Sequence, residues 1–161
     1  MSQQEVTKLF AAALRLKEYC VIGLLYGSGL RISELAALRI QDVESASKRI
    51  KVLQGKGAKD RYTLLAGNLL DKFRQYYVAA KRPKKYLFTS SQTGRAFHPR
   101  SMQFVVTGAM KKVGFEQKGY TSYTLRHSFA THMLDNGSNI HVIKTLLGHS
   151  KLDRTMVYLH L

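Results

Sequence analysis

The last third of the sequence holds an arginine, a histidine and a tyrosine that could act on a phosphate. Arg126 lies in a segment with helical spacing, His149 follows a glycine at a predicted helix end, and Tyr158 comes nine residues after that histidine. A phenol can attack phosphorus, while a guanidinium and an imidazole can donate hydrogen bonds to phosphate oxygens. The spacing gives the guanidinium, the imidazole and the phenol a plausible route to one pocket.

Three successive helical segments would have to position these groups. The apolar residues predict a first helix over residues 125–134, which an Asn-Gly-Ser sequence stops. A second helix is predicted over residues 140–147, and Gly148 just past its end suits a left-handed conformation. A third is expected from about residue 152, with Tyr158 along one face. The histidine after Gly148 therefore falls on a turn between two helices.

Two runs of this region resemble the tyrosine recombinases, also called phage integrases: LRHSFATH from Leu125 and LLGHS from Leu146. The resemblance covers nearly the whole chain and implies an enzyme that cuts and rejoins DNA without metal or ATP. It implies Tyr158 as the nucleophile, which would form a 3′-phosphotyrosine and free a 5′-hydroxyl. Arg126 would clamp the phosphate together with an upstream arginine, and His149 would donate a hydrogen bond to a phosphate oxygen.

The candidate for the upstream arginine stands at the start of another predicted helix. Arg31 is electrostatically unfavourable there, because the helix dipole already places positive potential at that end. The position makes sense if an anion is to be held. The alternative is a surface pair between Arg31 and Glu34, worth about 0.3 kcal/mol. The run GLRISEL also resembles the segment that carries the family's first catalytic arginine, which implies a catalytic Arg31 with Glu34 in support.

Two alternating stretches, residues 48–53 and 61–65, flank a glycine-rich turn and predict a β-hairpin. Lys56, Lys59 and Arg61 lie on or beside its tip, where they could form a solvated charged turn or contact DNA. The family has a lysine on such a hairpin, and this matches Lys56, which stands between two glycines. The resemblance implies that this lysine protonates the leaving 5′-oxygen, with Lys59 as the alternative.

One position departs from the family pattern. The family usually has histidine three residues before the second arginine, and this chain has Tyr123 there. A phenol can donate one hydrogen bond but is not a cation at neutral pH. His127 points about 100° away around the helix, so it is a poor substitute. We therefore expect active chemistry with a weakened general base.

The charge balance favours a polyanionic partner. The 161 residues include 26 Lys and Arg against 10 Asp and Glu, a net charge of +16 that is spread along the chain. A generic basic protein such as a ribosomal protein is the alternative, but the long basic tails typical of that class are absent. Double-stranded DNA is the expected partner, with no membrane involved, and the family resemblance implies that the full-length protein acts on it as a homotetramer.

The remaining composition excludes several classes of site. Cys20 lies in an apolar run and is expected as a buried, reduced thiol in a cytoplasmic, nucleoid-associated protein. The histidines show no zinc-ligand spacing, and no run is long and apolar enough to span a membrane. Asp42 and Glu44 form the closest upstream acidic pair, and nothing in the sequence resembles the carboxylate cluster that a two-metal nuclease requires. Metal-dependent phosphoryl transfer is therefore disfavoured. We expect no cofactor.

The expected architecture is a mainly α domain with one small antiparallel β-sheet (α+β), which agrees with the family fold. We expect residues 1–161 to form the catalytic domain, without the N-terminal DNA-clamping domain and the C-terminal extension of longer members. The further predicted elements are a first helix capped by Ser2, helices over residues 17–26, 67–80 and 101–113, and a short strand over residues 86–88.

Two other functions remain open from the sequence. A non-enzymatic helical DNA-binding regulator could use the basic surface alone. A type IB topoisomerase would share the active-site plan but would relax supercoils. The sequence does not identify the target DNA, and it does not distinguish a phage integrase from a chromosomal or mobile-element recombinase.

Overall fold

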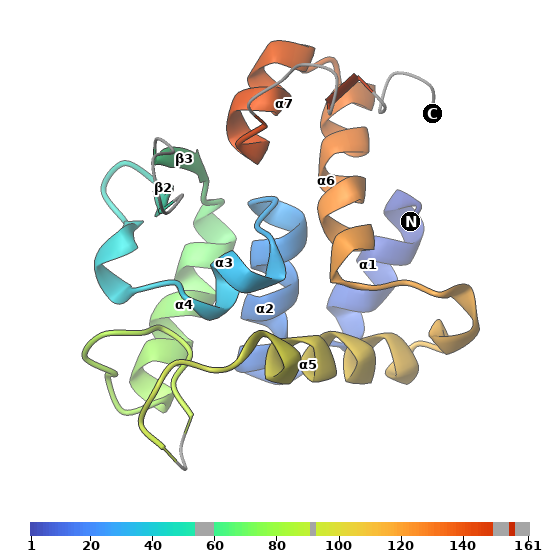
Figure 1. The fold of residues 1–161 in the computed structure, drawn as a ribbon. Helices are drawn as coiled ribbons and strands as arrows, with labels where there is room; N and C mark the ends of the chain where they lie inside the picture. The colour runs from blue at the N-terminus through green and yellow to red at the C-terminus, as the bar shows by residue number, and fades with distance from the viewer. Residues whose placement is uncertain (54–59, 91–92, 150–154, 157–161) are drawn as a thin grey trace.

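The computed structural model describes residues 1–53, 60–90, 93–149 and 155–156. These form a mostly helical fold with one small sheet (Figure 1). The elements in chain order are α1 (Gln3–Ala12), α2 (Leu16–Gly27), α3 (Ile32–Ala36), η1 (Ile40–Asp42), β1 (Val43–Glu44), β2 (Arg49–Val52), β3 (Arg61–Leu64), α4 (Gly67–Ala79), α5 (Pro99–Lys112), η2 (Glu116–Lys118), α6 (Ser122–Asp135) and α7 (Ile140–Leu147).

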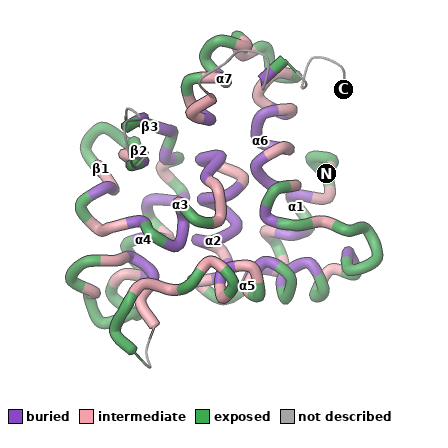
Figure 2. The backbone as a smooth tube through the Cα atoms, in the orientation of Figure 1, coloured by how far each residue is buried: buried purple, intermediate pink, exposed green. Residues whose placement is uncertain are grey.

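Helix α2 is the central element of the fold. It is apolar around most of its circumference, as expected for a helix that is surrounded by others, and it packs against α4, α5 and α6. Figure 2 shows its chain buried while the outer helices have exposed faces. Cys20 on this helix is a free, fully buried thiol, and burial raises its pKa to about 12. The expected buried, reduced cysteine is confirmed.

The sheet is antiparallel with strand order β1-β2-β3. The predicted hairpin is confirmed as β2 and β3, whose register pairs Val52 with Arg61. Strand β1 was not predicted, because two residues are too few to show an alternation. The strand expected over residues 86–88 is wrong: Tyr86 makes a single antiparallel bridge with Arg39 outside the named strands.

Most predicted helices lie within two residues of their expected bounds, and Ser2 caps α1 in a capping box with Glu5. Helix α6 begins at Ser122, earlier than the predicted residue 125, because Thr124 Oγ1 accepts a hydrogen bond from the amide of the N-cap residue Thr121 at 3.0 Å. Among the described helices, none combines the length and hydropathy needed to cross a lipid bilayer.

Helix α7 matches its predicted bounds and determines where the chain turns toward its end. Asn139 caps its first turn by accepting a hydrogen bond from the amide of His141, and Gly148 ends it at φ 74°. The helix packs against both β3 and α6 (Figure 1). The C-terminal end of α7 therefore lies where β3, α6 and the turn before α3 come together.

Candidate active site

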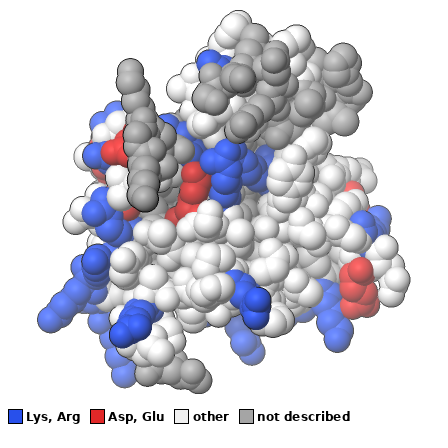
Figure 3. All heavy atoms as spheres, in the orientation of Figure 1, with Lys and Arg blue, Asp and Glu red and all other residues white. Residues whose placement is uncertain are grey.

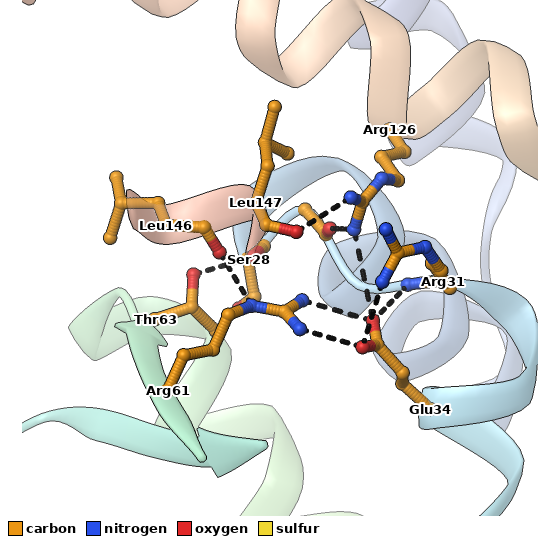
Figure 4. A network of polar contacts seen from close by, with 9 residues as sticks. Ser28, Arg31, Glu34, Arg61, Thr63, Arg126, Leu146 and Leu147 are labelled. Atoms are coloured by element: carbon orange, nitrogen blue, oxygen red, sulfur yellow. Dashed lines mark hydrogen bonds and ion pairs between the residues drawn. The ribbon is translucent and has the colours of Figure 1, made fainter. Parts of the chain in front are cut away.

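Three arginines from distant parts of the sequence surround the carboxylate of Glu34 (Figure 4). Arg61 donates to both carboxylate oxygens, with distances of 2.6 Å from Nη1 to Oε2 and 3.0 Å from Nη2 to Oε1. Nη1 of Arg31 lies 3.4 Å from Oε2, and Nη1 of Arg126 lies 3.7 Å from Oε1. The two arginines predicted as a phosphate clamp thus share one acidic neighbour.

Arg31 is the N-cap residue of α3 and the most accessible arginine of the three. Its backbone amide donates to Glu34 Oε1 at 2.8 Å, which forms one half of a capping box and fixes the carboxylate under the helix start. The side chain of Arg31 is 40% exposed, so an anion from solvent can reach the guanidinium. Arg31 and Glu34 do form the i,i+3 pair considered from the sequence, but the carboxylate is largely buried among further cations.

Arg126 on α6 is buried and bridges two backbone carbonyls. Its Nη1 donates to the carbonyl of Gly29 at 2.6 Å and its Nη2 donates to the carbonyl of Leu147 at 2.7 Å. A buried guanidinium is costly unless its N–H groups find acceptors. These bonds connect α6 to the turn before α3 and to the end of α7, so the orientation of Arg126 is fixed by three separate elements.

Arg61 differs from its sequence-based prediction. The sequence left Arg61 as either a solvated charge beside the hairpin tip or a residue that supports the site or contacts DNA, but only 7% of the residue is exposed. In addition to its bonds to Glu34, it donates from Nε to the carbonyl of Leu146 at 2.8 Å. The expectation of a DNA contact is therefore corrected: the guanidinium points inward because a carboxylate and a helix-end carbonyl satisfy it there.

The turn between α2 and α3 is joined to β3 by two short hydrogen bonds. Ser28 Oγ donates to the carbonyl of Leu64, and Thr63 Oγ1 donates to the carbonyl of Ser28, each at 2.6 Å. Both side chains are buried. Sequence reasoning missed these residues, because Gly-Ser-Gly indicates a tight turn but gives no sign of its partner strand.

His149 follows Gly148 on the turn after α7, as predicted. Its amide donates to the carbonyl of Lys144 at 3.1 Å, and its Nδ1 lies 2.7 Å from Oγ1 of the buried Thr155. Arg126 holds the carbonyl of Leu147, two residues before His149. The imidazole therefore lies at the same end of α7 as the second arginine. Thr155 was not predicted as its partner.

Tyr123 lies on the first turn of α6, and 65% of it is exposed. Its ring centroid is 6.1 Å from that of His127, with an interplanar angle of 34°. Burial, together with the positive charge of the N-terminus, lowers the pKa of His127 from its ordinary value. His127 is thus less able to carry a proton at neutral pH.

The electrostatics of the site depend on Glu34 remaining ionised. Burial alone would raise the pKa of this carboxyl, but the hydrogen bond and charge of Arg61 oppose it, as do the amide and charge of Arg31. The net effect is a lowered pKa, so Glu34 is a carboxylate at neutral pH. Lys56, Lys59 and Tyr158 lie outside the described residues, so their roles stay predictions.

Comparisons with known proteins identify the family. The sequence model of the phage integrase family matches residues 1–161. The chain is 38% identical over 160 residues to tyrosine recombinase XerA of Pyrococcus horikoshii, covering 98% of this chain and 55% of that protein. It is 39% identical over 158 residues to a tyrosine recombinase of Pseudothermotoga lettingae, covering 97% of this chain and 54% of that protein. The chain thus spans about half the length of these relatives.

Solved structures give the same assignment and confirm the predicted fold class. The crystal structure of XerA recombinase matches with a TM-score of 0.91 at 33% identity, covering 100% of this chain and 60% of that one. The XerH recombinase bound to its difH substrate matches with a TM-score of 0.86, covering 100% of this chain and 50% of that one, and at 21% identity this likeness shows the fold alone. The family resemblance read from the motifs is confirmed: the chain belongs to the phage integrase family, and the relatives it matches are named tyrosine recombinases.

Proposed function

We propose that this chain is the catalytic domain of a DNA site-specific recombinase or integrase that cuts and rejoins DNA through a 3′-phosphotyrosine intermediate. The observation that carries the proposal is the convergence of Arg31 and Arg126 on one side of the molecule. These arginines are far apart in the sequence, yet both lie within 3.7 Å of Glu34, and Arg126 also holds the end of the helix that precedes His149.

The two arginines are suited to hold the scissile phosphate. A planar guanidinium fork fits two phosphate oxygens better than a point charge does. Arg31 has the exposure to meet the incoming phosphate, and Arg126 supplies a fixed positive charge behind it. Positive groups that are positioned before the reaction stabilise the charge that develops on the non-bridging oxygens. Loss of either guanidinium should slow cleavage by about a hundredfold or more.

The remaining chemistry requires an attacking group and an acid. Tyr158 attacks phosphorus, so that a tyrosyl O–P bond forms while the bond to the 5′-oxygen breaks. A free phenol has a pKa near 10, so only about one in a thousand is ionised at neutral pH. The cations of the site favour the phenolate, His149 donates a hydrogen bond to a phosphate oxygen, and Lys56 gives a proton to the departing 5′-oxygen. The phosphotyrosine conserves the phosphodiester energy, so rejoining needs no ATP.

Double-stranded DNA is the proposed partner. The net charge of +16 favours sequence-independent phosphate contacts. Positive side chains occur across the face shown in Figure 3, and in its centre they meet acidic atoms. The structurally similar XerH recombinase is bound to its difH substrate. We infer that the full-length protein acts as a homotetramer on DNA in the cytoplasm, in association with the nucleoid.

A nicked suicide substrate tests the proposal. The released 5′ fragment diffuses away from such DNA, so the enzyme should accumulate as a covalent protein–DNA product. Tyr158→Phe should remove this product and leave DNA binding intact. Binding without any covalent product in the unaltered protein would instead indicate a DNA-binding regulator, and a covalent product with Tyr158→Phe would exclude Tyr158 as the nucleophile. Relaxation of a plasmid without two-site recombination would indicate a topoisomerase.

A further inference from the structure

One guanidinium connects three elements of the site without facing the solvent. Arg61 on β3 places two N–H groups on the two oxygens of Glu34 and a third on the carbonyl of Leu146. Its side chain is only 6% exposed, so DNA phosphates cannot reach it directly (Figure 4). The bidentate fork has a defined geometry that a single ammonium cannot reproduce. Arg61 therefore acts on its protein neighbours and not on the substrate.

The neighbours of Arg61 are the groups that hold the two candidate catalytic arginines. Glu34 also accepts from the amide and guanidinium of Arg31 and lies 3.7 Å from Arg126. Without Arg61 the carboxylate would lose the bidentate contact that fixes its orientation between Arg31 and Arg126. With both oxygens engaged by Arg61, the carboxylate is held in one orientation between these two arginines.

Arg61 also acts on the end of α7. It holds the carbonyl of Leu146, while Arg126 holds the next carbonyl, that of Leu147. Cations at a helix C-terminus are favourable because the terminal carbonyls carry partial negative charge. The two guanidiniums thus fix the last turn of α7, one from β3 and one from α6. His149 follows directly after this turn.

We propose that Arg61 is a positioning residue of the active site, which fixes the carboxylate of Glu34 between Arg31 and Arg126 and connects it to the end of α7. This inference rests on the proposed function and assigns it a further residue. A misplacement of about 1 Å in a catalytic group can reduce a rate by about a hundredfold. The loss of Arg61 should therefore slow cleavage although the residue does not touch DNA.

The charged groups near Glu34 determine how the loss of Arg61 would change the pKa of that carboxyl. Arg31, Arg61 and Arg126 face the carboxylate, and Asp42 and Lys51 line the same small cavity beside it. Asp42 is already paired with Arg39, and Lys51 lies 3.8 Å from Asp60. Burial raises the pKa of Glu34 and Arg61 lowers it. Without Arg61, the pKa of Glu34 should rise, and its carboxyl should take up a proton as the pH falls.

Single-turnover cleavage of a suicide substrate by the 161-residue chain tests this inference. Arg61→Met should reduce the rate at pH 7 by about a hundredfold with unchanged DNA affinity. Its rate should also fall more steeply than that of the unaltered protein as the pH is lowered from neutral, because the pKa of Glu34 is no longer lowered by Arg61. The matched control is Arg49→Met, because Arg49 lies on the neighbouring strand with a side chain that is 45% exposed. This control should react like the unaltered protein.

Two further variants separate positioning from folding. In Arg61→Met with Glu34→Gln, the added loss at low pH should disappear, because the amide cannot titrate. Arg61→Lys should keep the unaltered pH profile, because the ammonium still faces Glu34, but should react about tenfold more slowly, because it cannot bridge three acceptors. If Arg61→Met does not fold, Arg61→Lys carries the test. An unaltered rate for Arg61→Lys, or an acid loss that persists in the double variant, would overturn the inference.

The protonation of Glu34 can be measured without DNA. In an NMR titration, the pKa of this carboxyl should be higher in Arg61→Met than in the unaltered protein, whereas Arg61→Lys should leave it unchanged because the ammonium still faces Glu34. An unchanged pKa in Arg61→Met, or a raised one in Arg61→Lys, overturns the proposed network, whether or not cleavage is seen. Conversely, absence of covalent product from the unaltered chain refutes the proposed function while the titration still decides whether Arg61 controls the state of Glu34.

Discussion

Gly29 is a position where one added methyl group should disturb both the fold and the site. Its φ is 68°, a conformation that costs an L-residue about 1–2 kcal/mol. A Cβ atom there would lie 2.6 Å from the ring of Phe129 and 3.3 Å from a side-chain methyl of Leu147. Overpacking in a filled core typically costs about 1–3 kcal/mol more. Gly29→Ala should therefore lower the free energy of unfolding by about 2–5 kcal/mol.

The packing around Gly29 leaves little room for relief. Phe129 is 5% exposed and belongs to a small buried cluster with Ala130, Ile143 and Leu147. A shift of the ring would move α6 or α7, and the carbonyl of Gly29 is itself the acceptor for Arg126. We therefore expect Gly29→Ala to slow cleavage as well, even where the variant remains folded.

Gly119 provides a matched control for the backbone contribution. Its φ is also 68°, but a Cβ atom there would meet nothing within 4 Å. Gly119→Ala should cost only the conformational part, about 1–2 kcal/mol. Urea denaturation measures how much each variant loses in free energy of unfolding. The loss in Gly29→Ala should exceed the loss in Gly119→Ala by the cost of the steric clash, about 1–3 kcal/mol. With a typical slope of about 1–3 kcal/mol per molar urea, this corresponds to a midpoint shift of about 1 M. Equal losses in the two variants would refute the packing argument.

Three other predictions concern groups on α6 and α1. Arg126→Lys should slow covalent product formation by about a hundredfold, because one ammonium cannot span the two carbonyls that the guanidinium bridges, and single-turnover kinetics measure this. Tyr123→His should not abolish cleavage, whereas an unchanged rate in Tyr123→Phe would remove the proposed hydrogen-bonding role of that phenol. The pKa of Glu5 is lowered to about 2, first by the Ser2 amide and then by Lys118. The stability that ionised Glu5 contributes is present above pH 4.5 and is lost as the pH falls toward 2. The unaltered protein should therefore unfold at a higher temperature than Glu5→Gln at neutral pH, and this difference in unfolding temperature should shrink as the pH falls from 4.5 toward 2.

Apolar periodicity was sufficient to predict most of the fold, because burial of one helix face leaves a regular pattern over several turns. Helix α7 and the glycine that ends it match their predicted positions. The start of α6 was misplaced, since its first turn is fixed by the Thr124 hydroxyl and not by apolar residues. Strand β1 and the single bridge at Tyr86 depend on pairing with segments elsewhere in the chain. Such pairing leaves no local signal in so short a stretch.

Strand β3 explains why the site could be predicted only in part. Its sequence alternates, and hydrophobicity alone would place Tyr62 and Leu64 inside. The structure has the opposite arrangement: Arg61 and Thr63 are buried, while Tyr62 and Leu64 are 39% and 46% exposed. A shift of one residue in a strand exchanges its two faces.

The polar face of β3 is buried because its partners converge from other elements. Glu34 and the carbonyl of Leu146 satisfy Arg61, and the carbonyl of Ser28 satisfies Thr63. A buried polar group is tolerated when it is hydrogen-bonded, and these acceptors lie at least 27 residues away in the chain. Motif spacing could therefore identify Arg31 and Arg126 as candidates, but the residue that orients them becomes visible only when α3, β3 and α7 are packed together.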